Sequence, residues 1–469
     1  MARPITEEEK QAVQEMVQRA RVAMSAIEDY DQEKIDRLCR AVGWATANEK
    51  TFTRLSFMGV DESGIGDRAA RPNKRFKIMG ILRDALRQKS IGIIEDLPDK
   101  GIVKYAKPAG VIASLVPVTN AALTEPGNGI YALKCRDAII FSPHPASKNT
   151  TFETIRIMRA ALKKYGAPED IFQCLEKPSI PIAQELMAAC DLTIATGGAA
   201  MVKAAYSSGK PAYGVGAGNA TMVIDETANI EEAARNTRLS KTSDNGSGCS
   251  ADGNLLVDDS IYDRFLEQLR KEGGYLVTEA EKVQLQNAMW DAERHRTSNT
   301  IARPATKIAE IAGFTIPSDK TFLIVREDHI GNEFLFSSEK LSPVLAIFRY
   351  SGFEDALAKV KQIYEVGGKG HSCGIYSFDD DHINRLALIA PVSRMMVRQP
   401  QSKANAGAFN NGMPMTSSMG CGTWGGNITS ENIALKHYMN VTWVSRPIPE
   451  DRPTEQDLFG EFHNSETFD

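Results

Sequence analysis

Two hydrophobic patterns alternate along most of this chain. Short, continuously apolar runs, such as VIASLV at 111–116 and AIIF at 138–141, are typical of strands buried on both faces. Longer segments repeat apolar residues every three or four positions, as in residues 147–165, and predict amphipathic helices. Apolar strands that alternate with such helices predict an α/β fold, in which helices cover both faces of a parallel sheet.

The alternation falls into two blocks, one on each side of a polar stretch near residue 245. Helices are expected over 6–58 and 73–88, with Trp44, Phe76 and Met79 among the residues facing the core. The predicted strands are 111–116, 138–141, 170–175, 192–195, 211–216 and 221–225 in the first block, and 254–257, 322–325, 343–350, 373–378 and 394–398 in the second. The predicted helices are 147–165, 180–189, 229–240, 260–272, 278–290, 353–364 and 381–388.

Two further runs lie outside this alternation. Residues 91–95 and 101–105 flank the turn sequence PDKG, which is a hairpin signal. No antiparallel strands follow directly, so we expect the hairpin to form an arm, with which the late strand 438–445 is suited to pair. Residues 400–428 are rich in Gly, Ser, Asn and Thr but contain Met and Trp, which indicates an ordered loop at a site.

Composition excludes several classes of function. The 469 residues carry a formal net charge of -5 without a basic stripe, so no nucleic-acid partner is expected. Seven cysteines at irregular spacing, with no CxxC or HExxH, indicate a reducing compartment and no metal site. Residues 1–20 lack the features of a signal peptide, and no apolar run approaches a membrane span. We therefore expect a cytoplasmic protein that does not bind membranes.

The polar stretch SDNGSGCSADGN at 243–254 carries one cysteine, Cys249. Such a run is typical of a loop, where a substrate can reach a thiol. By itself the stretch fits a nucleophile and a plain Gly/Ser turn with a buried thiol about equally well. Cys421, in GCGTWGG, is the one rival nucleophile, because the other cysteines lie in or beside helix or strand patterns, and it ranks below Cys249.

Five more motifs adjoin predicted strands, where ligands meet a parallel sheet. TGG at Thr196–Gly198 opens a helix whose unpaired amides suit a phosphate, although such turns also occur without a ligand. SPHP at Ser142–Pro145 suits a ribose, and the amide of Asn120 in VPVTN suits an oxyanion; a plain turn is the alternative for each. The other two are EKLSP, with Glu339, and GGKGHS at 367–372.

In this order, the motifs resemble the aldehyde dehydrogenase superfamily, and more narrowly its CoA-acylating branch. VPVTN, AIIFSPHP, ATGGAAMVKAAYSSGKPAYGVGAGN, SKTSDNGSGC, EKLSP, GGKGH and GCGTWGGNITSEN all match, from about residue 5 to 445. The resemblance implies two Rossmann-like parallel-sheet domains plus a β-hairpin oligomerisation arm. Residues 1–90 and 109–240 would form the nucleotide-binding domain, 241–428 the catalytic domain with the nucleophilic cysteine, and 91–108 with 429–469 the arm and C-terminal tail.

The resemblance also implies roles for individual residues. Cys249 would be the nucleophile and Asn120 an oxyanion donor. The expected cofactor-binding residues are Ser142, Pro143, His144, Thr196, Gly197, Gly198, Gly216, Glu339 and Pro343. The residues expected to border the substrate are Ser247, Gly248 and His371. The cofactor would be NAD or NADP, with coenzyme A as co-substrate; Lys148 near the ribose site favours tolerance of NADP.

One departure from the family pattern bears on the chemistry. The hydrolytic enzymes that this chain resembles carry a water-activating glutamate where Gly214 lies, and glycine cannot act as a base. The acyl group on Cys249 is therefore expected to leave to the thiol of CoA, whose pKa of about 8–9 makes it less dependent on a base. Ser247, Gly248 and the C-terminal tail resemble the acylating enzymes of sulfoacetaldehyde, which favours sulfoacetaldehyde and sulfoacetyl-CoA; acetaldehyde or propionaldehyde is the alternative.

The expected partners follow from the same resemblance: a small aldehyde, CoA, and further copies of the chain in a homodimer or homotetramer. A hypothesis from another class is a catalytically inactive α/β binding protein that kept the fold. The presence of Cys249, Asn120 and Glu339 argues against it. No Arg or Lys is identified by the sequence as the partner of a sulfonate.

Overall fold

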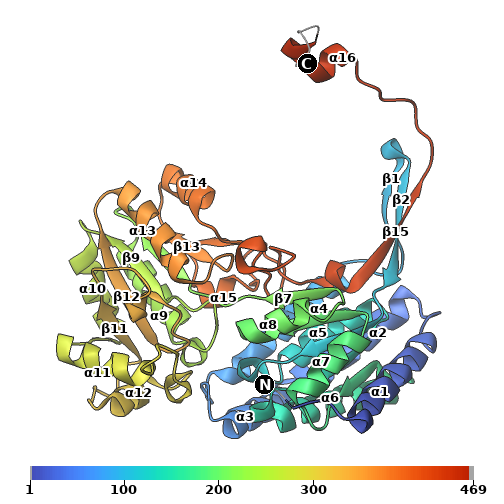
Figure 1. Cartoon of the computed structure of the whole chain (residues 1–469), viewed down its shortest axis with the longest axis horizontal. Helices are drawn as coiled ribbons and strands as arrows, with labels where there is room; N and C mark the ends of the chain where they lie inside the picture. Colours follow the sequence, from blue (N-terminus) through green and yellow to red (C-terminus); the bar gives the residue numbers. More distant parts are fainter. Residues whose placement is uncertain (1–2, 464–469) are drawn as a thin grey trace.

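The computed structural model describes residues 3–463, which form two lobes side by side with a narrow arm extending from one of them (Figure 1). Each lobe contains one parallel sheet, and the arm is a three-stranded antiparallel sheet. The predicted α/β architecture, two parallel sheets and a hairpin arm, is therefore confirmed.

The first lobe is built on five parallel strands in the order β5-β4-β3-β6-β7. These strands are β3 (Val111–Leu115), β4 (Ala138–Ser142), β5 (Phe172–Cys174), β6 (Leu192–Thr196) and β7 (Ala212–Val215). The surrounding helices are α1 (Glu7–Ser25), α2 (Gln32–Ala47), α3 (Glu49–Ser63), α4 (Arg75–Leu86), α5 (Thr124–Lys134), α6 (Lys148–Lys164), α7 (Ile180–Ala189) and α8 (Ala199–Tyr206). From β3 the chain adds β4 and β5 on one side and later β6 and β7 on the other, so the strand order reverses between β3 and β6.

The second lobe is built on seven parallel strands in the order β10-β11-β12-β9-β8-β13-β14. These strands are β8 (Thr221–Ile224), β9 (Asn254–Asp258), β10 (Gly274–Leu276), β11 (Phe322–Arg326), β12 (Val344–Tyr350), β13 (Cys373–Tyr376) and β14 (Met395–Val397). The helices are α9 (Ile230–Lys241), α10 (Tyr262–Lys271), α11 (Glu279–Met289), α12 (Ala305–Ala312), α13 (Phe353–Val366) and α14 (Asp380–Ile389). Separate apolar clusters fill the two faces of the sheet, one with α9 and α10 and the other with α11 to α14. Continuous apolar strands require this cover on both faces.

The arm confirms the predicted hairpin. β1 (Gly92–Leu97) and β2 (Ile102–Pro108) pair antiparallel around the turn Pro98–Lys100. β15 (Met439–Ser445) pairs with β2 along its full length, as expected for the late strand. Beyond β15 the chain runs away from both lobes and reaches the short helix α16 (Glu455–Phe459) (Figure 1).

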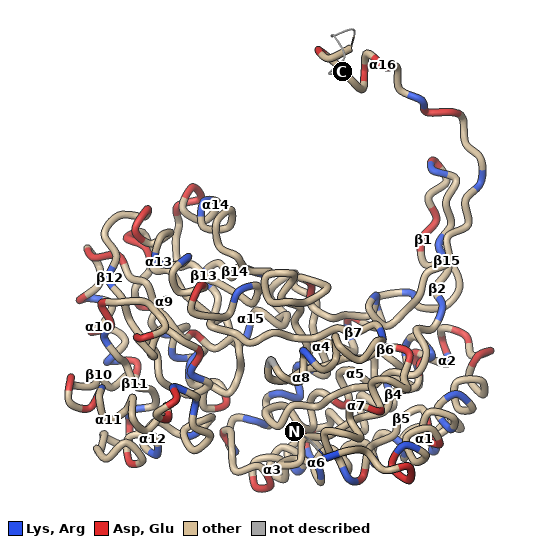
Figure 2. Tube along the Cα trace, in the orientation of Figure 1, with Lys and Arg blue, Asp and Glu red and all other residues tan. Residues whose placement is uncertain are grey.

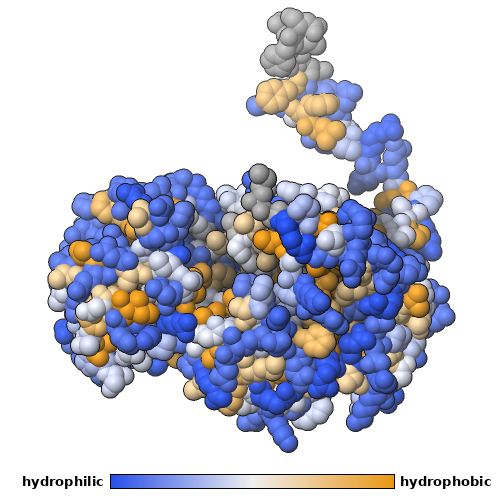
Figure 3. All heavy atoms as spheres, turned by 60° about the horizontal axis from the view of Figure 1, so that its bottom comes forward, coloured by the Kyte–Doolittle hydropathy of each residue, from blue (hydrophilic) through white to orange (hydrophobic). Residues whose placement is uncertain are grey.

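Charged residues of both signs are interspersed over the two lobes (Figure 2). Among residues 3–463, no helix combines the length and the apolarity needed to cross a membrane. The arm and the tail expose apolar side chains: Trp443 in β15 and Leu458 and Phe459 in α16 are each more than half exposed (Figure 3).

Two parts of the chain belong to a different lobe from the one predicted. β8 and α9 lie within the expected nucleotide-binding segment 109–240, but β8 pairs with β9 and β13 in the second sheet. Residues 433–438 were expected in the arm, but they contribute to the apolar core of the first lobe. These assignments were wrong because a buried apolar strand has the same hydrophobic pattern in either sheet.

The buried faces of two N-terminal helices also differ from prediction. In α4, Phe76 and Met79 are 44% and 43% exposed, whereas Ile78 and Ile81 are buried. Trp44 in α2 is 73% exposed. The core face was assigned from the largest apolar side chains, but smaller residues on another face make the contacts between helices.

Helix α5 was not predicted at all. Its sequence, TEPGNGIYALK, contains a proline and two glycines and is buried on every side. A helix that is buried all round lacks a polar face and therefore shows no amphipathic period. It includes Glu125, a fully buried carboxyl group whose pKa is raised by burial to about 7.

Replacing Glu125 by Gln tests the effect of this burial on stability. The pKa is higher in the folded chain than in the unfolded chain, where it is about 4.3, so ionisation lowers stability as the pH rises to 7. Because the amide does not ionise, Glu125→Gln is expected to have a small effect at pH 5 and to raise the free energy of unfolding by on the order of 3 kcal/mol at pH 8.5. Thermal and urea unfolding at both pH values measure the difference, and an equal effect at both would contradict it.

Candidate active site

Predicted site residues from three strands meet at one edge of the first sheet. Asn120 follows β3, Ser142 ends β4 and Thr196 ends β6. Because β3 lies between β4 and β6 and all three strands run parallel, their carboxyl ends adjoin one another. The reversal of strand order between β3 and β6 lies at the same edge, which is where open parallel sheets bind ligands.

The turn after β6 has the features of a phosphate site. Gly198 is the N-cap of α8, and no side chain caps this helix. A Cβ on Gly198 would meet nothing within 4 Å, so the space beside the turn is open, whereas one on Gly197 would lie 2.6 Å from the sulfur of Met201. The hydroxyl of Thr196 is 2.6 Å from that of Ser418 in the late loop. The open helix N-terminus fits the pyrophosphate of a dinucleotide.

The turn after β4 is partly buried. Ser142 and Pro143 are buried, and His144 is half-buried with its Nδ1 accepting a hydrogen bond from the amide of Ala146 (3.1 Å). Burial lowers the pKa of His144, so its imidazole is neutral at neutral pH. The proton of the neutral ring then lies on Nε2, which is free to donate to a ribose hydroxyl.

The loop that carries Cys249 begins with a left-handed turn. Asp244, Asn245 and Gly246 have φ angles of 51°, 53° and 67°. Aspartate, asparagine and glycine adopt this conformation most readily, which explains the sequence DNG. A Cβ on Gly246 would lie 2.6 Å from the main chain of Ser342 and 3.0 Å from the nitrogen of Pro343, so the turn packs directly on the EKLSP segment.

Cys249 is partly exposed and lies against His371. The Nε2 of His371 is 3.0 Å from Sγ, and its Nδ1 is 2.9 Å from the hydroxyl of Ser372. Burial, with the charge of Glu339, raises the pKa of the Cys249 thiol to about 12, and burial lowers the pKa of His371 to about 3. The resting pair is therefore a neutral thiol and a neutral imidazole that is placed to take its proton.

The rival nucleophile, Cys421, is fully buried. A Cβ on Gly216 would lie 3.1 Å from its sulfur, so Gly216 and Cys421 pack against each other. Among the described cysteines, Cys249 and Cys174 keep partial exposure, and Cys174 lies at the end of β5. Cys249 is thus the cysteine of the site loops that a substrate can reach.

Glycines allow the loops around Cys249 to approach one another closely. A Cβ on Gly218 would lie 1.9 Å from the carbonyl oxygen of Cys249, and one on Gly370 would lie 1.8 Å from a carbonyl oxygen of the late loop. A Cβ on Gly368 would lie 2.5 Å from the main-chain nitrogen of Asn219. Any side chain at these positions would force the loops apart, which explains the glycines of GVGAGN and GGKGHS.

Glu339 contacts the same loops. Its Oε1 accepts a hydrogen bond from the amide of Gly218 (3.0 Å), the residue that packs on the carbonyl of Cys249. Burial raises the pKa of Glu339 to about 7, against the lowering effect of Lys241 and Lys340. A partly buried carboxyl group with a shifted pKa beside a candidate nucleophile is typical of a functional site.

The side chain of Asn120 has a fixed orientation. Its Oδ1 accepts a hydrogen bond from the Nζ of Lys74 (2.8 Å), which also contacts the carbonyl of Thr119 (3.2 Å). An ammonium group only donates, so the amide oxygen faces Lys74 and the NH₂ group faces away. Within residues 3–463 the Nδ2 of Asn120 has no hydrogen-bond partner, which leaves its two N–H groups for an oxyanion.

Asp244 connects Asn120 to the loop of the nucleophile, and sequence reasoning missed it. Its carboxylate, 4% exposed, accepts hydrogen bonds from Arg71 (2.8 and 3.1 Å), Lys74 (2.7 Å) and the hydroxyl of Ser247 (2.8 Å). Burial alone would raise the pKa of Asp244, but the charges of Lys74 and Arg71 hold it well below its usual range. In the sequence, this contact is indicated only by an acidic residue in the loop and by the basic segment RPNK at 71–74. No local pattern connects the two.

The residues expected to border the substrate differ in their surroundings. The hydroxyl of Ser247 is engaged with Asp244, and Ser247 is buried. A Cβ on Gly248 would meet nothing within 4 Å, so there is open space directly beside Cys249. Of these residues, Gly248 and His371 adjoin the thiol most directly.

Arg394 is a second residue that sequence reasoning missed. It is 5% exposed and donates to the carbonyls of His371 (2.8 Å), Ser430 (3.1 Å) and Gly420. Its charge lowers the pKa of Cys249, which opposes the effect of burial. Arg394 therefore fixes the main chain of His371 to the late loop. Sequence reasoning missed Arg394 because this residue begins an ordinary predicted strand, and no local pattern marks it.

Gly214 was expected to lie where the hydrolytic enzymes carry a water-activating glutamate, but a side chain at this position would face α8 and not Cys249. A Cβ on Gly214 would lie 2.5 Å from Val202 and 2.8 Å from the ring of Tyr206, both in α8. A side chain there would collide with α8, so the interpretation of Gly214 as the empty place of a base was wrong. The basic group that lies against the sulfur is His371.

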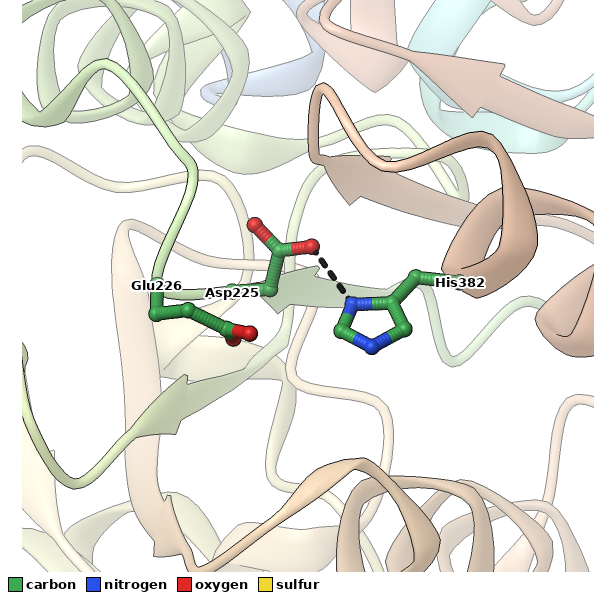
Figure 4. Close-up of side chains that lie close together, drawn as sticks. All are labelled: Asp225, Glu226 and His382. Carbon is green, nitrogen blue, oxygen red and sulfur yellow. Dashed lines mark hydrogen bonds and ion pairs between the residues drawn. The ribbon is translucent and has the colours of Figure 1, made fainter.

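Among the described residues, Asp225, Glu226 and His382 form the one cluster of potential metal ligands (Figure 4). The Nδ1 of His382 is 2.9 Å from one carboxylate oxygen of Asp225, and the other oxygen accepts hydrogen bonds from the amide and hydroxyl of Thr227. The ring of His382 stacks on Phe353 with the centroids 3.8 Å apart. These contacts fix the end of β8 to α14, so the cluster has a structural explanation.

The aldehyde dehydrogenase family model matches residues 3–444 of this chain. Sulfoacetaldehyde dehydrogenase from an Acholeplasma species is 44% identical, over 95% of this chain and 93% of its own length. Sulfoacetaldehyde dehydrogenase (acylating) from Bilophila wadsworthia is 40% identical, over 96% of this chain and 98% of its own length.

A solved structure of Rhodopseudomonas palustris propionaldehyde dehydrogenase, with bound CoA and an acylated cysteine, is similar with a TM-score of 0.82 and 26% identity. The similarity covers 92% of this chain and 97% of that one. With a family model that matches nearly the whole chain, and relatives at these identities, this chain belongs to the aldehyde dehydrogenase family.

Proposed function

We propose that this chain is a CoA-acylating aldehyde dehydrogenase, which interconverts an aldehyde plus CoA and an acyl-CoA, with sulfoacetaldehyde as the favoured aldehyde. The contact between the Sγ of Cys249 and the Nε2 of His371 carries the proposal. A thiol beside a neutral base, in loops that also hold an amide donor, is suited to covalent acyl transfer. A protein that only binds its ligand would not require a thiol in contact with a basic imidazole, as Cys249 and His371 are here.

In the first step, His371 accepts the proton of Cys249 as the sulfur bonds to the carbonyl carbon. The tautomer that suits this step carries its proton on Nδ1, 2.9 Å from the hydroxyl oxygen of Ser372, and leaves Nε2 free to take the proton of the thiol. The negative charge moves from sulfur to the aldehyde oxygen, where the NH₂ group of Asn120 donates. A free thiolate therefore need not accumulate in the buried site.

A bound nicotinamide dinucleotide supplies the hydride acceptor for the second step. The open N-terminus of α8 is placed to hold its pyrophosphate, Ser142 and His144 its adenine ribose, and Glu339 its nicotinamide ribose. Gly216 and Pro343 form part of the loops that border Cys249. The exposed Lys148 at the start of α6 favours tolerance of a 2′-phosphate, so NADP would be accepted beside NAD.

Loss of hydride from the carbonyl carbon leaves a thioester on Cys249. The proton that His371 took from Cys249 is released to solvent when the reduced cofactor leaves. The thiol of CoA then attacks the same carbon, and His371 is placed to take the proton of the incoming thiol and to return it to the Cys249 sulfur as that sulfur leaves. A thiol with a pKa of about 8–9 gives up its proton far more readily than water, so its attack depends less on a strong base. The relative with bound CoA and an acylated cysteine supports this order of steps.

The favoured aldehyde follows from the relatives. The two named for sulfoacetaldehyde are 44% and 40% identical to this chain, and the propionaldehyde enzyme is 26% identical. Acetaldehyde and propionaldehyde are the alternative substrates. We also propose that the exposed apolar arm mediates assembly into a homodimer or homotetramer, because Trp443 and its neighbours in β15 face solvent in the single chain.

CoA-dependent formation of NADH or NADPH, measured with sulfoacetaldehyde, acetaldehyde and propionaldehyde, tests the substrate. The highest kcat/KM is expected for sulfoacetaldehyde, and without CoA the reaction should stop after one acyl group per site. Equal or better values for the unsubstituted aldehydes would remove the sulfonate assignment, and steady turnover without CoA would remove the acylating one.

Replacing Cys249 by Ser tests the nucleophile. Aldehyde and NAD without CoA should add one acyl group to the peptide that contains Cys249 in the wild type and in the matched control Cys421→Ser. The Cys249→Ser variant should show no such adduct and no turnover, because a serine hydroxyl is a much weaker nucleophile at neutral pH than a thiol. Intact mass and peptide mass spectrometry measure the adduct, and its appearance on another residue would sink the assignment.

Replacing His371 by Ala removes the proton acceptor, and kcat is expected to fall about 10²- to 10⁴-fold at pH 7. The thiol, whose pKa is raised to about 12, would then ionise only by loss of its proton to solvent. The residual rate should therefore rise about tenfold per pH unit between pH 7 and 9, whereas the wild-type rate should vary less. His382→Asn, which changes the histidine of the structural pair, serves as the control; a flat profile for His371→Ala would contradict the role.

A further inference from the structure

Three basic side chains contact the turn that precedes Cys249, and a fourth lies within reach of the charge of one of them. We call them the basic cluster: Arg71, Lys74, Lys77 and Lys403. The first two lie in the short helix Arg71–Lys74, Lys77 lies in α4, and Lys403 lies in α15 (Gln401–Ala404). Figure 2 shows basic positions at α4 and α15 near the middle of the molecule.

Positive charge exceeds negative charge in the basic cluster. Asp244 contacts Arg71 (2.8 Å) and Lys74 (2.7 Å). Lys77 donates to two main-chain carbonyls, and Lys403 donates to a serine hydroxyl. In the described part of the chain, four cations thus have one carboxylate in direct contact.

The positive charge of Lys403 disfavours the charged forms of Lys74 and Lys77. Burial lowers the pKa of Lys74 and that of Lys77, the latter to about 8, and the charge of Lys403 lowers both further. An anion placed among them would relieve this repulsion. The arrangement favours a negative charge that the chain itself does not supply.

The basic cluster touches the residues placed at the reacting carbonyl. The Nζ of Lys74 is 2.8 Å from the Oδ1 of Asn120. The carboxylate of Asp244 also accepts from the hydroxyl of Ser247, two residues before Cys249. In sulfoacetaldehyde one methylene separates the carbonyl carbon from the sulfonate, so the sulfonate stays close to the residues that hold the carbonyl, and the basic cluster adjoins one of them, Asn120.

Lys403 is the member of the basic cluster with unused donors that reaches the surface. Lys74 spends its three N–H groups on Thr119, Asn120 and Asp244. Lys403 has one acceptor within residues 3–463, the hydroxyl of Ser243 (2.8 Å), so two N–H groups remain. Because its side chain is exposed, Lys403 can meet a ligand without the loss of an internal contact.

We infer that Lys403 donates directly to the sulfonate of the aldehyde, with Lys74 as the positive charge behind it. The inference rests on the proposed function, because it assigns residues to the substrate named there. Hydrogen bonds between an ammonium group and an anion are stronger than neutral ones, and an aldehyde without a sulfonate does not make them. Lys403 is therefore a specificity-determining residue, and Lys74 is also a positioning residue for Asn120.

Kinetics of Lys403→Met and Lys403→Arg with sulfoacetaldehyde and propionaldehyde test the inference. The methionine variant should lower the ratio of kcat/KM for sulfoacetaldehyde to that for propionaldehyde about 10- to 100-fold, mainly through KM. The arginine variant should keep most of the ratio, and the control Lys361→Met, which changes an exposed lysine of α13, should keep all of it. No change in the ratio, or equal losses with both aldehydes, overturns the inference.

Inhibition by ethanesulfonate separates this inference from the proposed function. Ethanesulfonate has the sulfonate but no carbonyl, so it should compete with propionaldehyde without reacting. Its inhibition constant should rise about 10- to 100-fold in Lys403→Met and with added salt. If the wild type shows this pattern but does not oxidise sulfoacetaldehyde, the substrate assignment fails and the anion site stands. If ethanesulfonate does not inhibit the wild type, the anion site is refuted whatever the substrate.

Discussion

A single buried carboxylate, that of Asp244, holds the candidate site together. It joins Arg71 and Lys74, which lie ahead of α4 in the first lobe, to the turn that leads to Cys249. Arg71 is 3% exposed, so removal of Asp244 would leave a buried cation without a partner, which typically costs about 3–5 kcal/mol. The same contact holds Asp244 in a left-handed conformation that is unfavourable for a residue with a side chain. The placement of the nucleophile, of Asn120 and of two members of the basic cluster therefore depends on one carboxylate.

Close packing of main chain against main chain determines the rest of the geometry. The carbonyl of Cys249 lies where a side chain on Gly218 would be, and the late loop lies where one on Gly370 would be. Such contacts leave no freedom for the loops to shift independently. They place the imidazole of His371 against the thiol, and Arg394 fixes the carbonyl of that histidine from behind. Rigid contacts of this kind hold reacting groups at a fixed distance, which is what proximity in catalysis requires.

The fold was predictable wherever the signal is local. Apolar runs and helical periods gave the strands and most helices, and the glycine-rich polar stretch around Cys249 marked a site loop. The sheet that β8 joins, the buried face of α4 and the existence of α5 were not predictable, because each depends on what packs against the element. The same holds for the site: Lys74 and Asp244 are 170 positions apart in the chain, and no spacing rule connects them. The motifs that resemble the family supplied Asn120 and Glu339, but not the charges around them.

The electrostatics of the site favour reaction with a bound aldehyde over reaction of the free thiol. Burial keeps the Cys249 thiol protonated, although the charge of Arg394 lowers its pKa. The side chain of Arg394 is bonded to carbonyls, and that of Lys74 to Asp244 and Asn120. An aldehyde changes this balance, because the charge that forms resides on its oxygen, where the amide of Asn120 is oriented to receive it. An anionic substituent on the aldehyde would add the attraction of the basic cluster. In the proposed site, selectivity for an anionic aldehyde and low reactivity of the resting thiol have one cause, which is that the lysines of the basic cluster act on the substrate and not on the sulfur.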